Sequence, residues 1–507
     1  MSSVIAREAE PRVARATITR LVIALVLAGL ADLLFYGWSV GISFPLFLAG
    51  LAVAAVAVNG RHAPLTLQIA MTAILLGAFA AAIEDISALS VIVSLAGTVS
   101  FVIVVTTEHP MQWHQYLIEA SATMLRGPIQ FAVDMLALLR RLRRNVPEWL
   151  APRSLVAWIV PLVASATFLA LFASANPLIE HALKLIDLSA GRDMLEARRM
   201  MFWVGVVAVT WSLIARRPAR ECCDAAPFKA AEAAPNVAKE LDGLFSAQAI
   251  SRSLILFNGL FAVQTASDLA FLWGGLSLLD GITHAEYAHR GAYPLIITAL
   301  LAAAFVLIAT RADGPASSSR WIRPLVLLWT TQNVLLVISA ILRLDLYVVA
   351  YSLTYWRLAA GIWMMLTAIG LVLILLQVWL HKPVSWLVAA NMISLAIVLY
   401  GCCFLNAPRT IAFFNLAHCH EIDGSGPNLD TDYLESLGPQ ALPAVEVYMD
   451  RIPMLQVLTA PRMRTSAASL ASAQGTNWRA WSYRGWRLKR YLDDHGLAPS
   501  LLKMDRG

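Results

Sequence analysis

Long apolar stretches separated by short polar segments repeat along most of the chain. A helix that crosses the hydrocarbon core of a bilayer needs about 20 mostly apolar residues, because each residue adds about 1.5 Å to its length. About eleven stretches approach or reach this length. The pattern therefore predicts an all-α, polytopic transmembrane helix bundle of about eleven spans with a small C-terminal extramembrane domain. The predicted spans are residues 21–40, 44–59, 65–83, 86–105, 154–174, 199–215, 251–273, 293–310, 324–342, 358–380 and 386–405.

The spacing of these stretches divides the chain into six predicted regions. Residues 216–250 are rich in alanine, proline and charge, which is typical of a flexible linker between two groups of spans. The other regions are an N-terminal four-span module (1–105), a cytoplasmic segment (106–153), two further spans (154–215), a five-span module (251–405) and a C-terminal extracytoplasmic domain (406–507).

The cytoplasmic segment contains a pattern that predicts an interfacial amphipathic helix from Pro128 to Arg144. Apolar side chains recur at helical spacing, and four arginines cluster at the C-terminal end. Such a helix can lie in the headgroup region, where the arginines meet anionic lipid. A solvated patch that stops translocation explains the same residues, and the sequence leaves both interpretations open.

Composition supports the membrane prediction. Of 507 residues, 59% are hydrophobic and 14% are charged, whereas soluble proteins have about 45–50% apolar and about 25% charged residues. These values exclude a soluble enzyme, a disordered chain and a disulfide-stapled secreted domain. The five cysteines show no metal-binding or redox spacing, so we expect free thiols.

Basic residues indicate how the chain is oriented. Lysine and arginine are concentrated in alternate connecting segments, beginning with the N-terminal one, and positive charge accumulates on the cytoplasmic side. The net charge of +6 at pH 7 is therefore attributed to cytoplasmic loops and not to nucleic-acid binding. With eleven spans, a cytoplasmic N-terminus places the tail from residue 406 outside, and one miscounted helix would reverse that side.

Ionisable residues inside or beside the spans are the main candidates for function, because charge in hydrocarbon is energetically costly. In the predicted topology they gather toward the outer face, where they predict a polar vestibule. Snorkelling boundary residues are the alternative, which is favoured for Glu84, Asp85 and Arg357. The predicted vestibule residues are Asp32, Asp268, Glu286, His289, Arg290, Arg343 and Asp345.

Amide side chains accompany two of these charges. Gln264 precedes Asp268 by one helical turn, with Asn258 on a neighbouring face, and Gln332 and Asn333 fall in the middle of a predicted span. These amides could line a pathway through the membrane. Hydrogen bonds that hold helices together use the same residues more often.

No residue pattern predicts catalysis, a metal or a cofactor. Glu286 and His289 could hold a metal or act as an acid–base pair, but the sequence offers no third ligand. His418 and its three successors in the tail are too close in sequence to surround one ion without a special turn. The tryptophan- and arginine-rich terminus is expected to meet lipid headgroups or pack within the tail, and not to bind nucleic acid.

Several motifs in the second half of the chain resemble the signature of a family of bacterial multi-span inner-membrane proteins that is known only as a domain of unknown function. The resemblance covers roughly residues 150–495, and Ser352 stands where that pattern has glycine. It implies the bacterial inner membrane and carries no activity, cofactor or catalytic residue. The motifs are Arg343–Tyr347, Tyr351–Thr354 with Arg357–Leu358, Glu286–Pro294, Tyr433–Leu434, Leu437–Pro439, Ala441–Pro443 and Trp481–Leu488.

Two classes of function follow from these observations. The first is a transporter or channel-like protein that uses the vestibule. The second is a non-catalytic envelope scaffold or signalling subunit, which binds an envelope protein through its outer loops and C-terminal domain. A membrane-embedded transferase is a weaker third interpretation, so an enzyme is the less favoured outcome. Membrane lipids are expected partners in every case, and the oligomeric state is not predicted.

Overall fold

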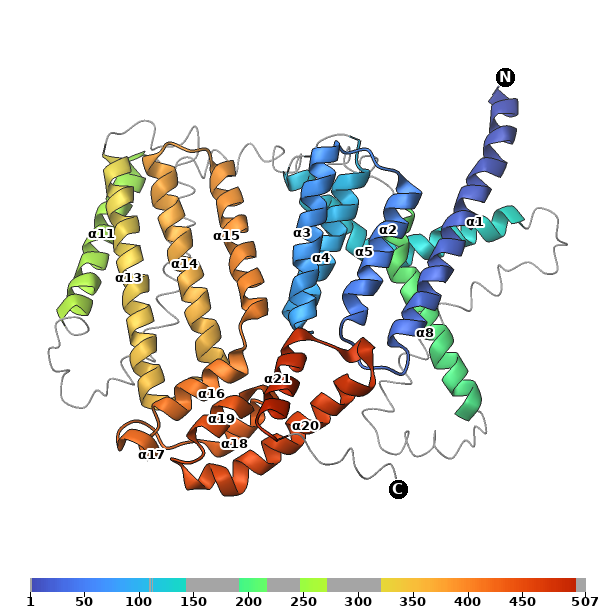
Figure 1. Ribbon diagram of the computed structural model, residues 1–507. Helices are drawn as coiled ribbons and strands as arrows, with labels where there is room; N and C mark the ends of the chain where they lie inside the picture. Colours follow the sequence, from blue (N-terminus) through green and yellow to red (C-terminus); the bar gives the residue numbers. More distant parts are fainter. Residues whose placement is uncertain are drawn as a thin grey trace, which may run out of the picture. The chain divides into compact units, whose positions relative to one another are not determined.

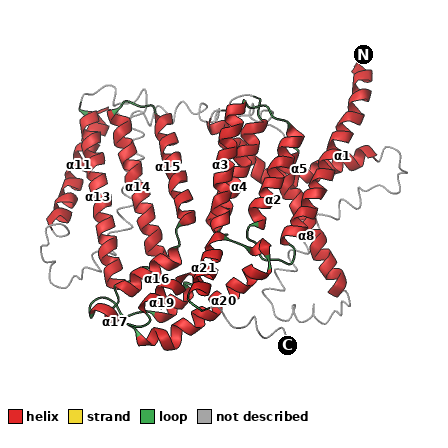
Figure 2. Cartoon of the chain, in the orientation of Figure 1, coloured by secondary structure: helices red, strands yellow, loops and turns green. Residues whose placement is uncertain are grey.

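The structure is a computed structural model that describes residues 2–108, 111, 113–142, 191–216, 247–270 and 321–497. Within these ranges every regular element is a helix (Figure 2), so the fold is all-α, as the sequence predicts. The chain divides into two compact units, Met1–Asp224 and Ala225–Gly507.

Figure 1 shows the first unit as a group of packed helices, most of which share a large apolar core. This core joins α1, α2, α3, α4 and α8, and the indole of Trp211 in α8 is fully buried in it. The described helices are α1 (Ser2–Phe35), α2 (Ser43–Asn59), α3 (Leu65–Glu84), α4 (Ala88–Thr106), α5 (Trp113–Leu142) and α8 (Gly191–Ile214).

Small residues bring α3 and α4 into close contact. Gly97 of α4 lies so near Ala78 of α3 that a Cβ atom on the glycine would be 2.6 Å from the alanine Cβ. One turn earlier, the hydroxyl of Ser94 donates a hydrogen bond of 3.0 Å to the Ala78 carbonyl oxygen. Contacts of this kind hold helices together in lipid, where the hydrophobic effect does not.

Helix α5 carries its polar side chains inward and its apolar side chains outward. Glu119, Thr123 and Asp134 are buried, and the Trp211 indole N–H donates to Asp134 Oδ2 at 2.9 Å. Polar groups that find partners inside the protein while apolar groups face outward are typical of a helix in lipid. The exposed apolar side chains are Ile118, Leu125, Ile129 and Val133.

Helix α5 begins earlier than the predicted start at Pro128. It starts at Trp113, and Pro128 lies in its interior. The preceding residue, Gly127, lies against α8, where an added Cβ would be 2.8 Å from the Ala208 carbonyl oxygen. Packing against α8 therefore holds the helix together across the position where proline removes a backbone donor.

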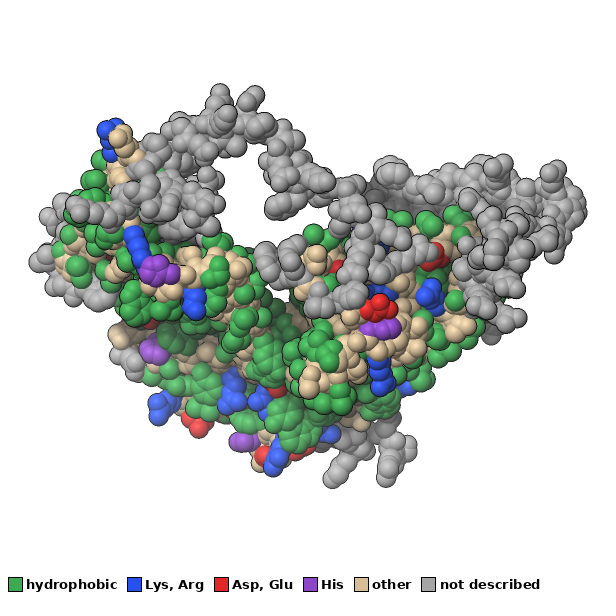
Figure 3. All heavy atoms as spheres, turned by 90° about the horizontal axis from the view of Figure 1, so that it is seen from above, with side chains coloured by type: hydrophobic (Ala, Val, Ile, Leu, Met, Phe, Trp, Pro, Cys, Tyr) green, Lys and Arg blue, Asp and Glu red, His purple; other side chains and the backbone are tan. Residues whose placement is uncertain are grey.

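The second unit begins with a layer of long helices. These are α11 (Ala247–Asp268), α13 (Ile322–Tyr351), α14 (Tyr355–Trp379) and α15 (Val384–Phe404), and their core joins α11, α13 and α14. Helix α15 contributes little to that core and exposes Ile393 and Ile397, which are 60% and 65% accessible. Hydrophobic side chains cover much of the described surface (Figure 3).

Short helices follow α15 and pack around a separate apolar core (Figure 1). Asn415 joins them to the long helices, since its amide donates to the Leu353 carbonyl at 2.9 Å and accepts from the Leu353 N–H at 2.6 Å. Buried Arg484 donates to the Cys403 carbonyl at 3.1 Å. The short helices are α16 (Ala407–Ala417), α17 (His420–Asp423), α18 (Thr431–Ser436), η6 (Pro439–Ala441), α19 (Leu442–Tyr448), η7 (Leu455–Thr459), α20 (Ala460–Thr476), η8 (Trp478–Ala480) and α21 (Tyr483–Asp494).

Seven described helices are long and apolar enough to cross a membrane, and the chain is therefore an integral membrane protein. Helix α2 is also apolar but has 17 residues, and α11 is not among the seven. The predicted spans 154–174 and 293–310 lie outside the described residues. The seven are Ala16–Phe35, Leu65–Glu84, Ala88–Thr106, Ala197–Ile214, Ile322–Tyr351, Tyr355–Trp379 and Val384–Phe404.

Two helix ends differ clearly from the sequence prediction. The span predicted over 21–40 ends at Phe35, because the chain turns at Gly37 with φ +77°. The span predicted over 324–342 continues to Tyr351. The predicted end was Leu342, but the next residue, Arg343, does not end the helix because it is buried against a partner within the unit.

Candidate functional site

The second unit contains an ion pair buried between two of its long helices. Arg343, in the last third of α13, donates from Nη2 to Oδ1 of Asp268, the last residue of α11. Their side chains are 4% and 1% exposed. A guanidinium and a carboxylate are stable in such surroundings only together, because each would otherwise lose its hydration without compensation.

Amide side chains extend this polar contact along α11 and α13. Gln264 donates from Nε2 to Asp268 Oδ1 at 3.0 Å. About 15 Å away along α11, Asn258 donates to the Leu325 carbonyl of α13 at 3.1 Å, and Gln332 donates back to the Asn258 carbonyl at 3.4 Å. The predicted polar residues of the two helices thus make contacts at two levels along α11 and α13, and we call them together the α11–α13 polar row.

Three amide oxygens of this row accept no hydrogen bond in the part of the chain that the structure describes. They are Oδ1 of Asn258, Oε1 of Gln332 and Oδ1 of Asn333, and each atom is inaccessible to solvent. Asn333 uses only its NH₂ group, which donates to the Trp329 carbonyl at 2.8 Å. Buried acceptors without donors are destabilising, so the row offers binding capacity for a proton donor or a cation.

The first unit contains a second ion pair, at the end of α1. Arg199 of α8 donates from Nε to Asp32 Oδ1 at 2.8 Å, and its Nη2 contacts the other carboxylate oxygen. Trp203, one turn further along α8, donates its indole N–H to Asp32 at 3.0 Å. The Arg199 side chain is 51% exposed, so this pair is far more accessible than the buried pair of the second unit.

The turn between α13 and α14 explains several residues of the sequence signature. Ser352 has φ +70° and ψ +161°, a conformation that glycine adopts without strain. Arg357 donates to the carbonyl oxygens of Tyr351 and Ser352, and its guanidinium lies 4.5 Å from the centroid of the Tyr347 ring. Thr354 caps α14 by accepting a hydrogen bond from the Arg357 N–H.

Comparison of the chain with known protein families supports the resemblance seen in the sequence. A family described as a domain of unknown function, DUF4153, matches residues 46–448, which is well over half of the chain. The chain belongs to this family. The match begins about 100 residues before the resemblance seen in the sequence and ends before the Trp481–Leu488 motif. Comparisons of the DUF4153 chain with curated proteins and with solved structures gave no match.

The remaining predicted residues of the DUF4153 chain differ in burial, and some lie outside the described residues. Asp345 is exposed, although it lies only two positions from buried Arg343. Glu84 is 6% exposed at the end of α3, so it is buried and is not the snorkelling boundary residue that the sequence favoured. Glu286, His289 and Arg290 lie outside the described residues.

The vestibule as a single site stays a prediction. Asp32 belongs to the first unit, whereas Asp268, Arg343 and Asp345 belong to the second. Within the described ranges, no group of three or more histidine, cysteine, aspartate or glutamate side chains could hold a metal ion. The tail residues Cys419 and His420 accordingly have separate environments, with the Cys419 thiol buried and His420 exposed.

The sequence did not predict a second group of polar contacts in the first unit, which Arg216 makes just after the end of α8. The sequence pattern places Arg216 as the first residue of a linker. Its side chain is 7% exposed, and it donates to the Ile103 carbonyl at 2.9 Å and to Thr107 Oγ1 at 3.0 Å. Its Nη2 also lies 3.3 Å from Glu119 Oε1. Burial lowers the pKa of the Arg216 guanidinium, and the charge of Glu119 opposes that shift.

A sequence signal for Asp32–Arg199 did exist. Asp32 lies near the outer end of the first predicted span and Arg199 at the outer end of the sixth, so both belong to the same membrane face in the predicted topology. No comparable signal exists for Arg216 and Glu119, because both lie in segments that the sequence assigns to loops.

Proposed function

We propose that this DUF4153 protein is a transporter or channel-like protein of the bacterial inner membrane, and that the α11–α13 polar row forms part of its pathway. The observation that carries the proposal is the buried ion pair between Asp268 and Arg343. Ionisable groups within membrane helices are costly, and they commonly mark ion pathways and proton relays.

The ion pair also suggests how binding could be coupled to movement. Protonation of Asp268 would remove its negative charge and with it most of the attraction for Arg343. The buried guanidinium would then lose the charge of this carboxylate partner, which favours a rearrangement of α13 relative to α11. A proton arriving at Asp268 would thus act as the trigger for a conformational change.

The vacant amide oxygens support a small, positively charged or hydrogen-donating solute. Asn258, Gln332 and Asn333 each offer an acceptor oxygen within the row. Carbonyl-type oxygens can replace the water molecules around a cation as it passes through a protein. Apolar residues around the row, such as the stacked rings of Phe257 and Trp329, would keep bulk water out.

Proton flux into proteoliposomes tests this function directly. The full chain is reconstituted with the pH-sensitive dye pyranine inside, and an inward proton gradient is applied. We expect acidification by the wild-type protein and a fall to the rate of protein-free liposomes for the double variant Asp268→Asn, Arg343→Gln, which removes both charges together. The matched control is Asp432→Asn, which removes an exposed carboxylate outside the polar row and the predicted vestibule. Equal flux for wild type and double variant would reject the proposed pathway.

The proposed orientation has a cytoplasmic N-terminus and an extracytoplasmic segment from residue 406. Alkaline phosphatase fused after residue 405 or after residue 507 would be active in that orientation, because the enzyme matures only outside the cytoplasm. Inactive fusions at both points, with equal expression, would place the tail in the cytoplasm.

A surface on α21 favours the second candidate function, an envelope scaffold or signalling subunit. Tyr483 and Trp486 stack at 5.6 Å and are exposed, and Arg487 and Arg490 lie over their rings. Exposed aromatic and arginine side chains are enriched at protein interfaces. The variant Tyr483→Ser, Trp486→Ser should then lose crosslinks to an envelope protein while keeping any proton flux.

A further inference from the structure

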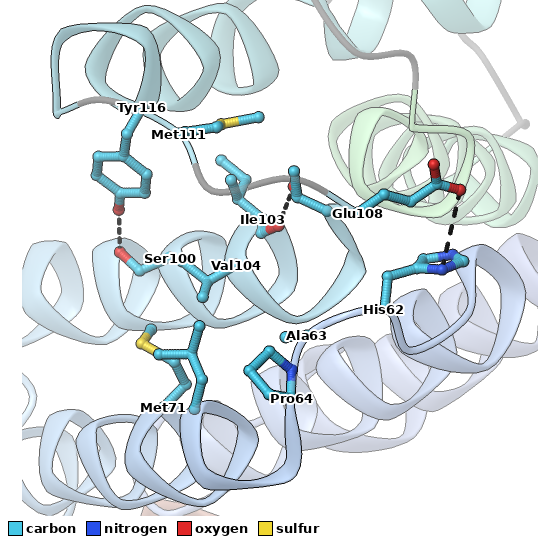
Figure 4. Close-up of a pocket in the computed structure, with 12 residues that line it drawn as sticks. His62, Ala63, Pro64, Met71, Ser100, Ile103, Val104, Glu108, Met111 and Tyr116 are labelled. Atoms are coloured by element: carbon cyan, nitrogen blue, oxygen red, sulfur yellow. Dashed lines mark hydrogen bonds and ion pairs between the residues drawn. The ribbon is translucent and has the colours of Figure 1, made fainter.

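An apolar pocket of about 650 Å³ opens at one end of α3 and α4 in the first unit. It is formed by the segment that leads into α3 and by the end of α4 with the residues that follow it. Figure 4 shows Met71 and Val104 pointing into its apolar part, with the hydrogen-bonded hydroxyls of Ser100 and Tyr116 at one side. Pockets that bind small molecules have volumes of about 300–1,000 Å³.

The pocket runs from the ends of two membrane-spanning helices toward their middle. Met71 lies six residues after the start of α3, and Ser100 lies six residues before the end of α4. Six helical residues correspond to about 9 Å. The floor is therefore at the depth of acyl chains if the helix ends lie at the membrane boundary, while the mouth is at the depth of headgroups.

The mouth of the pocket carries one carboxylate and one imidazole side chain. His62 Nδ1 lies 3.9 Å from Glu108 Oε1, and the two side chains are 39% and 70% exposed. A contact this long and this exposed is weak, so either group can turn to another partner. Glu108 offers a carboxylate to a cation. His62, whose Nε2 also lies 3.3 Å from the Asn59 carbonyl oxygen, offers an imidazole N–H to a phosphate oxygen when it turns from these partners.

We propose that this pocket binds a zwitterionic phospholipid with a primary ammonium headgroup. One acyl chain fills the apolar part beside Met71 and Val104, the ammonium pairs with Glu108, and the phosphate meets His62. A headgroup with net negative charge fits less well, because exposed Glu108 would repel it. An apolar interior combined with a mouth that offers both a carboxylate and an imidazole distinguishes this site from the general lipid-facing surface.

Photocrosslinking with a defined lipid tests the proposal. The full chain is placed in nanodiscs that contain phosphatidylethanolamine with a diazirine on one acyl chain, and labelled peptides are identified by mass spectrometry. We expect labelling near Met71 and Val104 to exceed labelling at the exposed Leu76 of α3 by about tenfold, which corresponds to about 1.4 kcal/mol of preferential binding.

Two leucine-to-tryptophan variants of α3 provide a matched comparison. Leu67 lines the pocket, and Leu76 is exposed elsewhere on the same helix. Leu67→Trp should fill the pocket and abolish the excess labelling, whereas Leu76→Trp should leave it unchanged. Both proteins are first required to elute and to unfold like the wild type. Uniform labelling of α3, or an unchanged pattern in folded Leu67→Trp, would overturn the proposal.

The headgroup assignment is tested with the same diazirine on phosphatidylglycerol, which is anionic. The wild type should prefer phosphatidylethanolamine, and Glu108→Gln should reduce that preference by about threefold, in line with the energy of an exposed ion pair. Asp432→Asn, at an exposed carboxylate of the second unit, is the control. Equal pocket labelling by both lipids in the wild type would overturn the assignment of a zwitterionic ligand.

Discussion

The guanidinium of Arg343 and the carboxylate of Asp268 form an ion pair in the second unit, although 75 positions separate them in the chain. Neither side chain has more than 4% of its surface accessible. A pair this deeply buried can be nearly neutral in its net effect on folding, but its two halves depend strongly on one another. Because of that mutual dependence, removal of one charge should affect the stability of the protein differently from removal of both, and the difference can be measured.

The single variant Asp268→Asn should destabilise the protein by about 3–5 kcal/mol, because it removes the carboxylate charge that pairs with the buried guanidinium of Arg343. The double variant Asp268→Asn, Arg343→Gln should recover most of that loss, since no charge remains buried. Unfolding of the purified protein in mixed micelles with increasing denaturing detergent measures both values. Additive effects of the two substitutions would contradict this coupling.

The Asp32–Arg199 pair of the first unit, in which Arg199 is half-exposed, should contribute less to stability. Asp32→Asn is expected to cost about 1 kcal/mol or less, because the half-exposed Arg199 regains water when its partner is neutralised. Salt should reduce even that small effect. Unfolding measured at low and high ionic strength checks this. A loss as large as that of Asp268→Asn would show that Arg199 is not half-exposed in the native protein.

Ser352→Gly should stabilise the turn between α13 and α14. The backbone conformation at φ +70° costs a serine about 1–3 kcal/mol, while glycine loses about 0.5–1 kcal/mol more entropy on folding. We therefore expect a higher unfolding temperature for Ser352→Gly and no increase for Ser352→Ala, which keeps the strain. A gain from both variants would trace the effect to the lost hydroxyl.

Gly97→Ala should weaken the contact between α3 and α4 by about 1–3 kcal/mol, because the new methyl group would overlap Ala78. Gly205 of α8 is the matched control, since an added Cβ there meets open space and alanine favours a helix. Opposite shifts in unfolding temperature are expected for the two alanine variants. Equal shifts would mean that α3 and α4 are not closely packed at Gly97.

Burial raises the pKa of the Cys419 thiol, and a hydrogen bond and charge from Glu421 raise it further. The folded state therefore keeps the proton to a higher pH than the unfolded state, so this thiol stabilises the fold below its ordinary pKa and loses that contribution as the pH rises. Alkylation by iodoacetamide at mildly alkaline pH, followed peptide by peptide, should be much slower at Cys419 in folded than in unfolded protein. Equal rates would show that the thiol is accessible.

The sequence by itself determined the architecture. Hydrocarbon solvates only apolar side chains, so membrane spans can be recognised from local composition. The predicted spans 65–83 and 386–405 lie close to the bounds of helices α3 and α15. It also made Asp268 and Arg343 stand out, because each charge interrupts an apolar stretch. Ser352, read as a departure from the family pattern, lies at the turn where the backbone favours glycine.

Only the tertiary structure decided which polar groups are partners. Asp32 pairs with Arg199 and Arg216 with Glu119 across distant parts of the first unit, whereas Asp345 is exposed beside buried Arg343. Local composition records how apolar a stretch is, but pairing depends on which helix faces meet, and that is set by packing over the whole unit. The same packing forms the pocket beside His62, for which no stretch of the sequence gives a signal.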